Sequence, residues 1–569
     1  MNGHPERPDG RDAYPNAAAG QRGRAASSRR NSDEGGGIVG QGLRLFALFV
    51  TGAATLALQL IASRILTPYF GVSLYIWTGI LVVTLVALAA GYALGGWLSN
   101  GRRPGDADGM FGTAPAVAGG CLAFGALVYP NLFPLLARLD LALGAILASV
   151  VLLGPALVIL AGMNPLLVAT FRRGSADAGS GNVFAWSTAG SVIGVLAAAF
   201  VFIPHLTNFS SLLAVAVALA TVSAGWAVFS GRPREDRIRA VKAAVIAVLM
   251  AVLSQGIHFG LPGRPAISAF GYDVVTASPS AHGTVRVVDI PAQAGETDRV
   301  MLVDGMNMGM QRLPAENGVA PASIGFPHAL TAIARQRNRS QGVLVLGLGI
   351  GSVPMMLTGE GYPVDAVEIS PTVVDIATDY FGFDPGRVPV HEVDARIFAR
   401  HCPGDDGQRY DAILVDLFAG DGIPDHLVTR EFFEDLRSCL TPGGTVAFNT
   451  IATANASIID SDLLATVVSV FGMTTVIEDV APGSDVGNAY LASPPMLDPE
   501  AATFDEAPAA VRDGLIAAFA GAERIGASDL GHGRVLTDEN NRFVVSARQE
   551  QMTYRRHIVE SLPPALLLN

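Results

Sequence analysis

Apolar residues follow two different patterns along the chain. Before about residue 260 they form long stretches with few charges, and a helix needs roughly 20 such residues to cross a bilayer. From Tyr272 onward the apolar runs are short and alternate with amphipathic segments and Gly- or Pro-rich turns. The pattern predicts a multi-pass α-helical membrane domain followed by a soluble α/β domain.

The apolar stretches predict about seven transmembrane spans within a domain at residues 41–262. They lie near residues 43–62, 74–98, 112–134, 142–170, 183–203, 209–229 and 240–259. Small residues crowd these spans, as in GAATLA at 52–57, GYALGG at 91–96 and AGSVIG at 189–194, and such faces let helices approach closely in lipid. The lipid bilayer of the cell (inner) membrane is therefore an expected partner. Residues 1–40 lack any apolar period and are predicted to be a disordered tail.

The soluble half divides into a small and a large unit. Residues 270–335 begin with two alternating segments, VVTASPSAHGTVRVVDI and RVMLVDGMNMG, which predict a small β-module and a linking helix. Residues 336–550 alternate strands and helices, which predicts a doubly wound, mainly parallel sheet of the Rossmann-like type.

A glycine-rich turn follows the first strand of this sheet. The sequence VLVLGLGIG at 343–351 ends a buried strand with Gly347, Gly349 and Gly351, where the backbone can turn sharply and approach a ligand. The next strand delivers Glu368, whose carboxylate can accept hydrogen bonds from ribose hydroxyls. The arrangement predicts a nucleoside site.

Two further carboxylates, Asp394 and Asp416, follow later strands of the same sheet. Strand carboxyl ends converge on one crevice, so Glu368, Asp394 and Asp416 are expected to meet there. Three carboxylates suit an adenosine that carries a positive sulfonium better than a pyrophosphate. The alternative is that each carboxylate only caps the helix that follows it.

Composition limits the partners and the chemistry. Half of the 569 residues are hydrophobic and 15% are charged, which is too apolar for a soluble enzyme of this size. A net charge of −12 argues against a nucleic-acid partner, because phosphate binding requires a basic face. Cys121, Cys402 and Cys439 show neither metal-ligand nor disulfide spacing, so free thiols and no metal are expected.

Several motifs carry a family resemblance. LVLGLGIGSVP, VDAVEISPTVVDIA, VDAR, YDAILVDLFAGDGIPDHLVTREFF and LTPGGTVAFN resemble the catalytic domain of spermidine synthases, the polyamine aminopropyltransferases. With ASRILTPYFGVSLYIW, GNVFAWSTAGSVIG and the late LTDEN segment, the chain more closely resembles bacterial proteins that fuse a multi-helix membrane region to that domain. The resemblance implies a methyltransferase-like fold, an amine substrate, a homodimer, and decarboxylated S-adenosylmethionine or S-adenosylmethionine as co-substrate.

The resemblance also implies roles for individual residues. The loop glycines would line the cofactor, Glu368 would bind the ribose, and Asp416 would activate the amine. The remaining implied contacts are with the adenine, from Asp394 and Ala395, and with the polyamine, from Asp421 and His328.

The sequence departs from the family pattern in the glycine loop. Spermidine synthases usually carry an Asp there that binds the ammonium of the decarboxylated cofactor, and this chain has Ile350. His282 likewise stands where the family has a Tyr. Three functions therefore remain open: aminopropyl transfer to a polyamine such as putrescine, transfer from intact S-adenosylmethionine, and polyamine transport or sensing.

Two observations give opposite orientations in the membrane. Loops rich in arginine, such as those with Arg102 and Arg232, alternate with loops that are poor in it, which places the N-terminus in the cytoplasm. Seven spans would then leave the soluble domain outside, although its cofactor is made in the cytosol. Proline within 112–134 and 142–170 could break a span and change the parity. A cytoplasmic catalytic domain is therefore expected.

Overall fold

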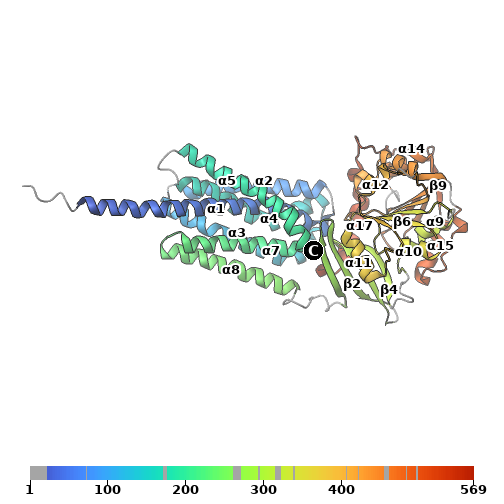
Figure 1. The fold of residues 1–569 in the computed structure, drawn as a ribbon, viewed down its shortest axis with the longest axis horizontal. Helices are drawn as coiled ribbons and strands as arrows, with labels where there is room; N and C mark the ends of the chain where they lie inside the picture. Colours follow the sequence, from blue (N-terminus) through green and yellow to red (C-terminus); the bar gives the residue numbers. More distant parts are fainter. Residues whose placement is uncertain are drawn as a thin grey trace, which may run out of the picture.

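The computed structural model has a long helical bundle at one end and an α/β domain at the other (Figure 1). It describes residues 22–71, 74–100, 102–170, 176–259, 271–292, 295–313, 322–337, 340–404, 407–420, 422–453, 460–481, 483–494 and 498–568. The predicted fold class, a helical domain followed by an α/β domain, is confirmed.

Seven helices of the described chain are long and apolar enough to cross a membrane, as predicted. Their apolar parts are Gly40–Phe70, Ile76–Ser99, Gly105–Leu136, Leu141–Ala169, Gly181–His205, Asn208–Phe229 and Arg234–His258. The full helices are α1 (Arg22–Phe70), α2 (Leu74–Ser99), α3 (Pro104–Leu136), α4 (Leu141–Thr170), α5 (Ala176–Ala197), α7 (Asn208–Phe229) and α8 (Arg234–Phe259). A π-helical turn, η1 (Ala198–Phe202), and the short α6 (Ile203–His205) continue α5.

Two expectations about the bundle need correction. Helix α1 begins at Arg22, so residues 22–40 are helical where a disordered tail was predicted; residues 1–21 lie outside the described part. A helix that has formed over an apolar span extends easily, because each added residue gains a hydrogen bond without a new nucleation cost. Helices α3 and α4 are each continuous despite their internal prolines, so neither forms a re-entrant pair.

Glycines bring the bundle helices into close contact, as their small-residue motifs predict. A Cβ on Gly190 of α5 would lie 1.9 Å from the Phe49 carbonyl oxygen of α1. A Cβ on Gly95 of α2 would lie 2.3 Å from the Gly162 carbonyl oxygen of α4. Only glycine permits these two helix pairs to pack at this distance.

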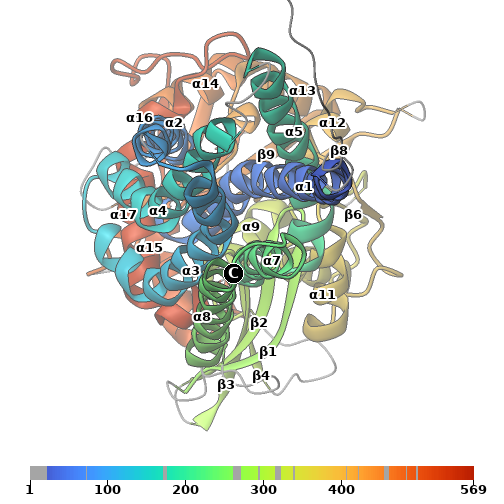
Figure 2. The ribbon, with the colours of Figure 1, turned by 90° about the vertical axis from the view of Figure 1, so that its left-hand side faces the viewer.

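The β-module forms a separate antiparallel sheet next to the bundle (Figures 1 and 2). Its strands follow in the order β1 (Asp273–Ser280), β2 (Gly283–Pro291), β3 (Thr297–Val303) and β4 (Met306–Leu313). The linking helix α9 (Gly325–Arg335) then leads into the main domain.

The main sheet has eight strands in the order β12-β10-β11-β9-β8-β5-β6-β7. Strands β7, β6, β5, β8 and β9 are parallel, whereas β11, β10 and β12 are antiparallel. The strands are β5 (Val343–Leu346), β6 (Val364–Val367), β7 (Val390–His391), β8 (Tyr410–Val415), β9 (Leu440–Thr453), β10 (Met473–Asp479), β11 (Val486–Ser493) and β12 (Glu523–Gly526). The covering helices include α10 (Ser352–Gly359), α11 (Pro371–Phe381), α12 (Ala395–Arg400), α13 (Arg430–Cys439), α14 (Ser461–Phe471) and α15 (Ala509–Ala520).

The C-terminal segment contacts the helical bundle. Helix α16 (Phe543–Ser546) is followed by α17 (Arg548–Ser561), which extends past residue 550, the expected domain end. Arg555 of α17 donates from Nη1 to the Pro68 carbonyl oxygen of α1 at 2.9 Å. The buried Leu567 and Leu568 pack into the apolar core of the bundle.

Two of the three cysteines differ from the prediction of free thiols. Cys402 and Cys439 are joined as a disulfide, with their Cα atoms 5.3 Å apart, and Cys121 is free. They are 37 residues apart in sequence, so their proximity depends on how α12 and α13 pack rather than on a spacing motif.

Candidate active site

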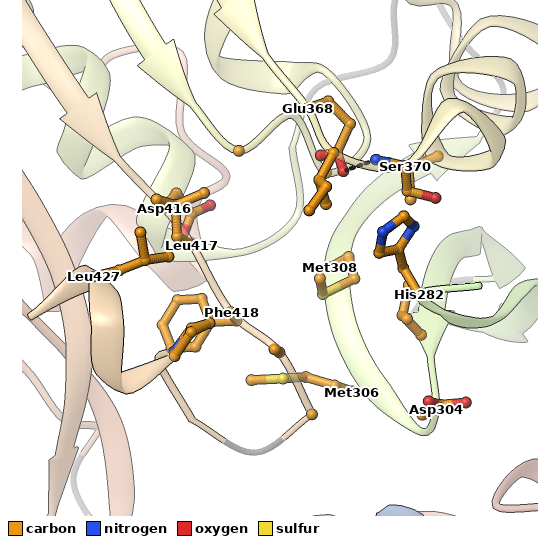
Figure 3. A pocket seen from close by; sticks show the side chains of 18 of the residues that line it. His282, Asp304, Met306, Met308, Glu368, Ser370, Asp416, Leu417, Phe418 and Leu427 are labelled. Atoms are coloured by element: carbon orange, nitrogen blue, oxygen red, sulfur yellow. Dashed lines mark hydrogen bonds between the residues drawn. The ribbon is translucent and has the colours of Figure 1, made fainter. Parts of the chain in front are cut away.

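A cavity of about 570 Å³ lies at the carboxyl ends of the parallel strands and extends to the end of the helical bundle. Its volume falls within the range of roughly 300–1,000 Å³ that is usual for small-molecule sites. Three parts of the chain line it: the main domain, the β-module, and the ends of α1 and α2. Figure 3 shows Glu368 and Asp416 on the side of the main sheet, with His282, Met306 and Met308 facing them from the β-module.

The glycine loop contributes two residues, Gly347 and Gly349, to the cavity lining. Gly347 has φ +92°, and a Cβ there would lie 2.1 Å from the Asp416 carbonyl oxygen. Gly349 has φ +53°, and its Cβ would lie 2.5 Å from the Met308 carbonyl oxygen. Both line the cavity. Gly351, at the start of α10, does not line the cavity, and a Cβ there would meet the Phe383 side chain.

Glu368 holds the loop in place and lines the cavity at the end of β6. Its Oε2 accepts a hydrogen bond from the Leu348 amide at 3.1 Å, and its Oε1 accepts one from the Ser370 amide at 2.9 Å. Burial raises the pKa of Glu368, and these amides oppose the shift. Each carboxylate oxygen has a second lone pair, so Glu368 can also accept ribose hydroxyls.

Asp394 both caps a helix and lines the cavity. A role as a helix cap is therefore compatible with a role in the nucleoside site. Its Oδ1 accepts the amides of Arg396 and Ile397 at 2.9 and 3.1 Å, which caps α12. Ala395, at the first position of α12, also lines the cavity, and first-turn amides have no intrahelical acceptor. Ile369, which the sequence reasoning missed, is 45% exposed in the cavity wall and offers an apolar face to a base.

Asp416 ends β8 beside the glycine loop, where the sequence predicted a general base. Burial raises the pKa of Asp416 to about 6, and a hydrogen bond from Asn449 opposes the shift. Asn449 Nδ2 donates to Asp416 Oδ1 at 2.8 Å, and Asn488 Nδ2 donates to Asn449 Oδ1 at 2.9 Å. Asn449 and Asn488 therefore form a chain that orients the carboxylate, and neither was identified as a site residue from the sequence.

The two residues implied to bind polyamine do not form part of the described cavity wall. His328 is 3% exposed within α9, and its Nε2 lies 3.0 Å from the Ala322 carbonyl oxygen. This buried contact uses the ring nitrogen for structure, so the expected contact between His328 and the substrate needs correction. Asp421 lies outside the described residues.

Ile350 also points away from the cavity. It is 4% exposed, and its side-chain atoms lie 2.5–3.0 Å from where a Cβ on Gly309 of β4 would stand. The loop position that carries an acid in spermidine synthases thus packs the β-module against the main domain. Among the described residues, no group of three or more His, Cys, Asp or Glu side chains could hold a metal ion.

Comparisons with known proteins match part of the chain. No family model matches the chain. A polyamine aminopropyltransferase from Vibrio vulnificus (strain CMCP6) is 43% identical over 155 residues, which make up 26% of this chain and 50% of that protein. This similarity confirms the predicted resemblance to spermidine synthases.

Methyltransferases are also similar to part of the chain. An N-terminal histidine N-methyltransferase from Emericella nidulans is 30% identical over 195 residues, 32% of this chain and 34% of that protein. The chain therefore spans half or less of the length of these curated relatives. A probable spermidine synthase structure from Corynebacterium glutamicum ATCC 13032 aligns at 18% identity with a TM-score of 0.36, covering 47% of this chain and 96% of that one.

Proposed function

We propose that the chain is a membrane-anchored transferase that moves an aminopropyl group from decarboxylated S-adenosylmethionine to an amine nitrogen. The observation that carries this proposal is the position of Asp416, a carboxylate with a raised pKa beside the glycine loop in a cavity that also contains Glu368. The names of the similar aminopropyltransferases support a polyamine as the amine acceptor, and putrescine is a simple polyamine with which to test it.

Asp416 acts in this proposal as the general base. An amine attacks carbon only through an unprotonated nitrogen, so a nearby group must accept the proton. A carboxyl group with a pKa of about 6 is ionised at neutral pH and is a better base than an ordinary aspartate. Asn449 and Asn488 fix one carboxylate oxygen, which leaves lone pairs of Asp416 for the substrate N–H.

The residues around the glycine loop fit an S-adenosyl nucleoside. Gly347 and Gly349 let the loop pass close to the Asp416 and Met308 carbonyl oxygens, where any Cβ would collide, and both glycines line the cavity. Glu368 offers acceptors to the ribose, and the Ala395 amide with Ile369 offers a donor and an apolar face to the base. The bound nucleoside supplies an electrophilic carbon next to a sulfonium sulfur.

Methyl transfer from intact S-adenosylmethionine is the second candidate, and Ile350 favours it. A loop carboxylate would bind the ammonium of the decarboxylated donor and repel the carboxylate of the intact one. Ile350 does neither, because it is apolar and packs against Gly309. The chain therefore lacks this one means of rejecting the intact donor.

Mass spectrometry of the nucleoside product separates the candidates. Purified full-length protein is supplied with each donor in turn and with a panel of amines that includes putrescine. We expect methylthioadenosine, the product of aminopropyl transfer; S-adenosylhomocysteine would instead establish methyl transfer. Donor binding without either product would contradict both reactions and support a sensor or transporter.

A further inference from the structure

The far end of the cavity is formed by the helical bundle, not by the α/β domain. Ser63, Arg64 and Thr67 of α1 and Ile76 and Trp77 of α2 belong to its lining. An acceptor seated between Asp416 and this end of the cavity therefore contacts residues of the apolar helices. A soluble polyamine requires no such wall.

Arg64 gives the bundle end of the cavity a positive charge. Its guanidinium donates from Nη2 to the Ala281 carbonyl oxygen in the turn between β1 and β2. Burial, and secondarily the charge of Arg64, lowers the pKa of the neighbouring His282, so His282 is neutral at neutral pH. The acidic side chain on this side, Asp304, accepts the Thr284 amide at 3.0 Å, and its charge acts on the buried Arg286.

An exposed apolar stripe on α2 leads to the same end of the cavity. Trp77, Leu81 and Leu85 follow at helical spacing and are 41, 49 and 66% exposed. All three lie in an apolar span of 24 residues. Trp77 belongs both to this stripe and to the cavity wall, so a molecule lying along α2 within the bilayer can reach the cavity from the side.

We propose that the acceptor is a membrane phospholipid with a primary amine in its head group, a substrate class that rests on the transferase function proposed above. Its acyl chains would lie along the α2 stripe, its phosphate would pair with Arg64, and its amine would reach Asp416. A free polyamine offers no anionic group to Arg64. The bundle end of the cavity, with Arg64, Ile76 and Trp77, matches the phosphate and apolar part of an amphiphile, and the carboxylates at the other end suit its amine.

The transfer step balances without another reactant. The lipid nitrogen donates its lone pair to the carbon attached to the sulfonium sulfur, and a C–N bond forms. The C–S bond breaks, and its electron pair stays on sulfur, which leaves as a neutral thioether. The proton released from nitrogen passes to the Asp416 carboxylate.

Reconstituted full-length protein tests the proposal. The protein is mixed with decarboxylated S-adenosylmethionine and one of four acceptors. Two acceptors are vesicles, of phosphatidylethanolamine with phosphatidylglycerol or of phosphatidylcholine with phosphatidylglycerol. The other two are soluble: glycerophosphoethanolamine and putrescine. We expect nucleoside product and a heavier lipid only with phosphatidylethanolamine vesicles. In Arg64→Gln the apparent KM for that lipid should rise at least about tenfold while the donor Kd changes little.

Two matched variants show whether the charge is responsible. Arg64→Lys keeps the charge and should retain a KM near that of the wild type. Arg138→Gln removes the arginine beside Glu560 at the same end of the bundle, outside the cavity, and should not change turnover. Unfolding temperatures of all three variants report whether the junction remains folded.

The other outcomes separate this proposal from the proposed function. Turnover of putrescine but not of the lipid would overturn the lipid acceptor and leave the transferase intact. Equal turnover of glycerophosphoethanolamine would overturn access from the bilayer, and an unchanged lipid KM in Arg64→Gln would overturn the phosphate contact. Donor binding with no product from any amine would contradict the transferase itself.

Discussion

At the residue scale, burial raises the pKa of Asp416, and the hydrogen bond from Asn449 opposes this rise. Only the ionised carboxylate can accept a proton, so kcat/KM should rise with pH through about 6 and level off above it. In Asn449→Ala the carboxylate loses the bond that lowers its pKa, so the midpoint of this rise should move to higher pH. The pH profile of the two proteins measures the shift. An identical midpoint would show that Asn449 does not position the base.

Glu368 allows a separate test of the nucleoside site. In Glu368→Gln the ribose should lose a charge-assisted acceptor of about 1.5–3 kcal/mol, equivalent to a Kd weaker by roughly 10- to 150-fold. Calorimetry with the donor measures this loss. The amide side chain keeps one acceptor for the Leu348 or Ser370 amide, so the unfolding temperature should fall only slightly. An unchanged Kd would mean that the glycine loop binds another ligand.

Site residues at the ends of parallel strands could be predicted from the sequence better than site residues on other helices and strands. Glu368, Asp394 and Asp416 could be predicted, because parallel strands bring their carboxyl ends to one crevice. His328 could not be placed correctly, since helical position alone does not tell which face of α9 is buried. Asn449 and Asn488 had no signal of their own, because their role depends on β9 and β11 being neighbours in the sheet.

At the scale of elements, glycine contacts decide how the bundle helices pack. A Cβ on Gly95 would lie 2.3 Å from the Gly162 carbonyl oxygen, whereas one on Gly96 would meet nothing within 4 Å. We expect Gly95→Ala to lower the unfolding temperature, since overpacking costs about 1–3 kcal/mol. Gly96→Ala, the matched control, should leave it unchanged or raise it, because alanine favours a helix over glycine. Equal effects in thermal unfolding would show that the α2–α4 contact is not tight.

Elements with a clear period were predicted closely, and irregular ones were not. The spans and the strands β5, β6 and β8 followed from apolar runs that suit one structure. Strand β7 spans only the two residues Val390–His391, which is too short to show a period in the sequence. The antiparallel pairing of β11 with β9 and β10 depends on long-range contacts that no local pattern contains.

At the scale of the whole molecule, the bundle and the soluble domain build one cavity together. Arg64 and Ala281, which join the two parts, are 217 residues apart in sequence. The sequence suggested a membrane anchor and a separate enzyme, because nothing in a local pattern shows that α1 ends and α2 begins at the candidate active site. The arrangement gives the bundle a role in forming the substrate site.

Orientation in the membrane can be tested at this scale. We propose that the soluble domain faces the cytoplasm, where S-adenosyl donors are made. Helix α2 begins at the cavity and ends before Arg102, and Arg232 lies in the turn between α7 and α8. The distribution of arginines over the loops favours the reverse orientation. In Ser340→Cys, a membrane-impermeant thiol reagent should label the exposed position only after lysis, with the wild-type chain as control. Labelling of intact cells would place the domain outside.

The most direct test of the central claim is the turnover of Asp416→Asn compared with the wild type. The asparagine side chain keeps the shape of the carboxylate but cannot accept the proton, and loss of a general base costs roughly 10²- to 10⁴-fold in rate. We therefore predict a fall in kcat of this size for nucleoside product, with the donor Kd changed by no more than a few fold. Near-normal turnover by a folded Asp416→Asn protein would contradict the account.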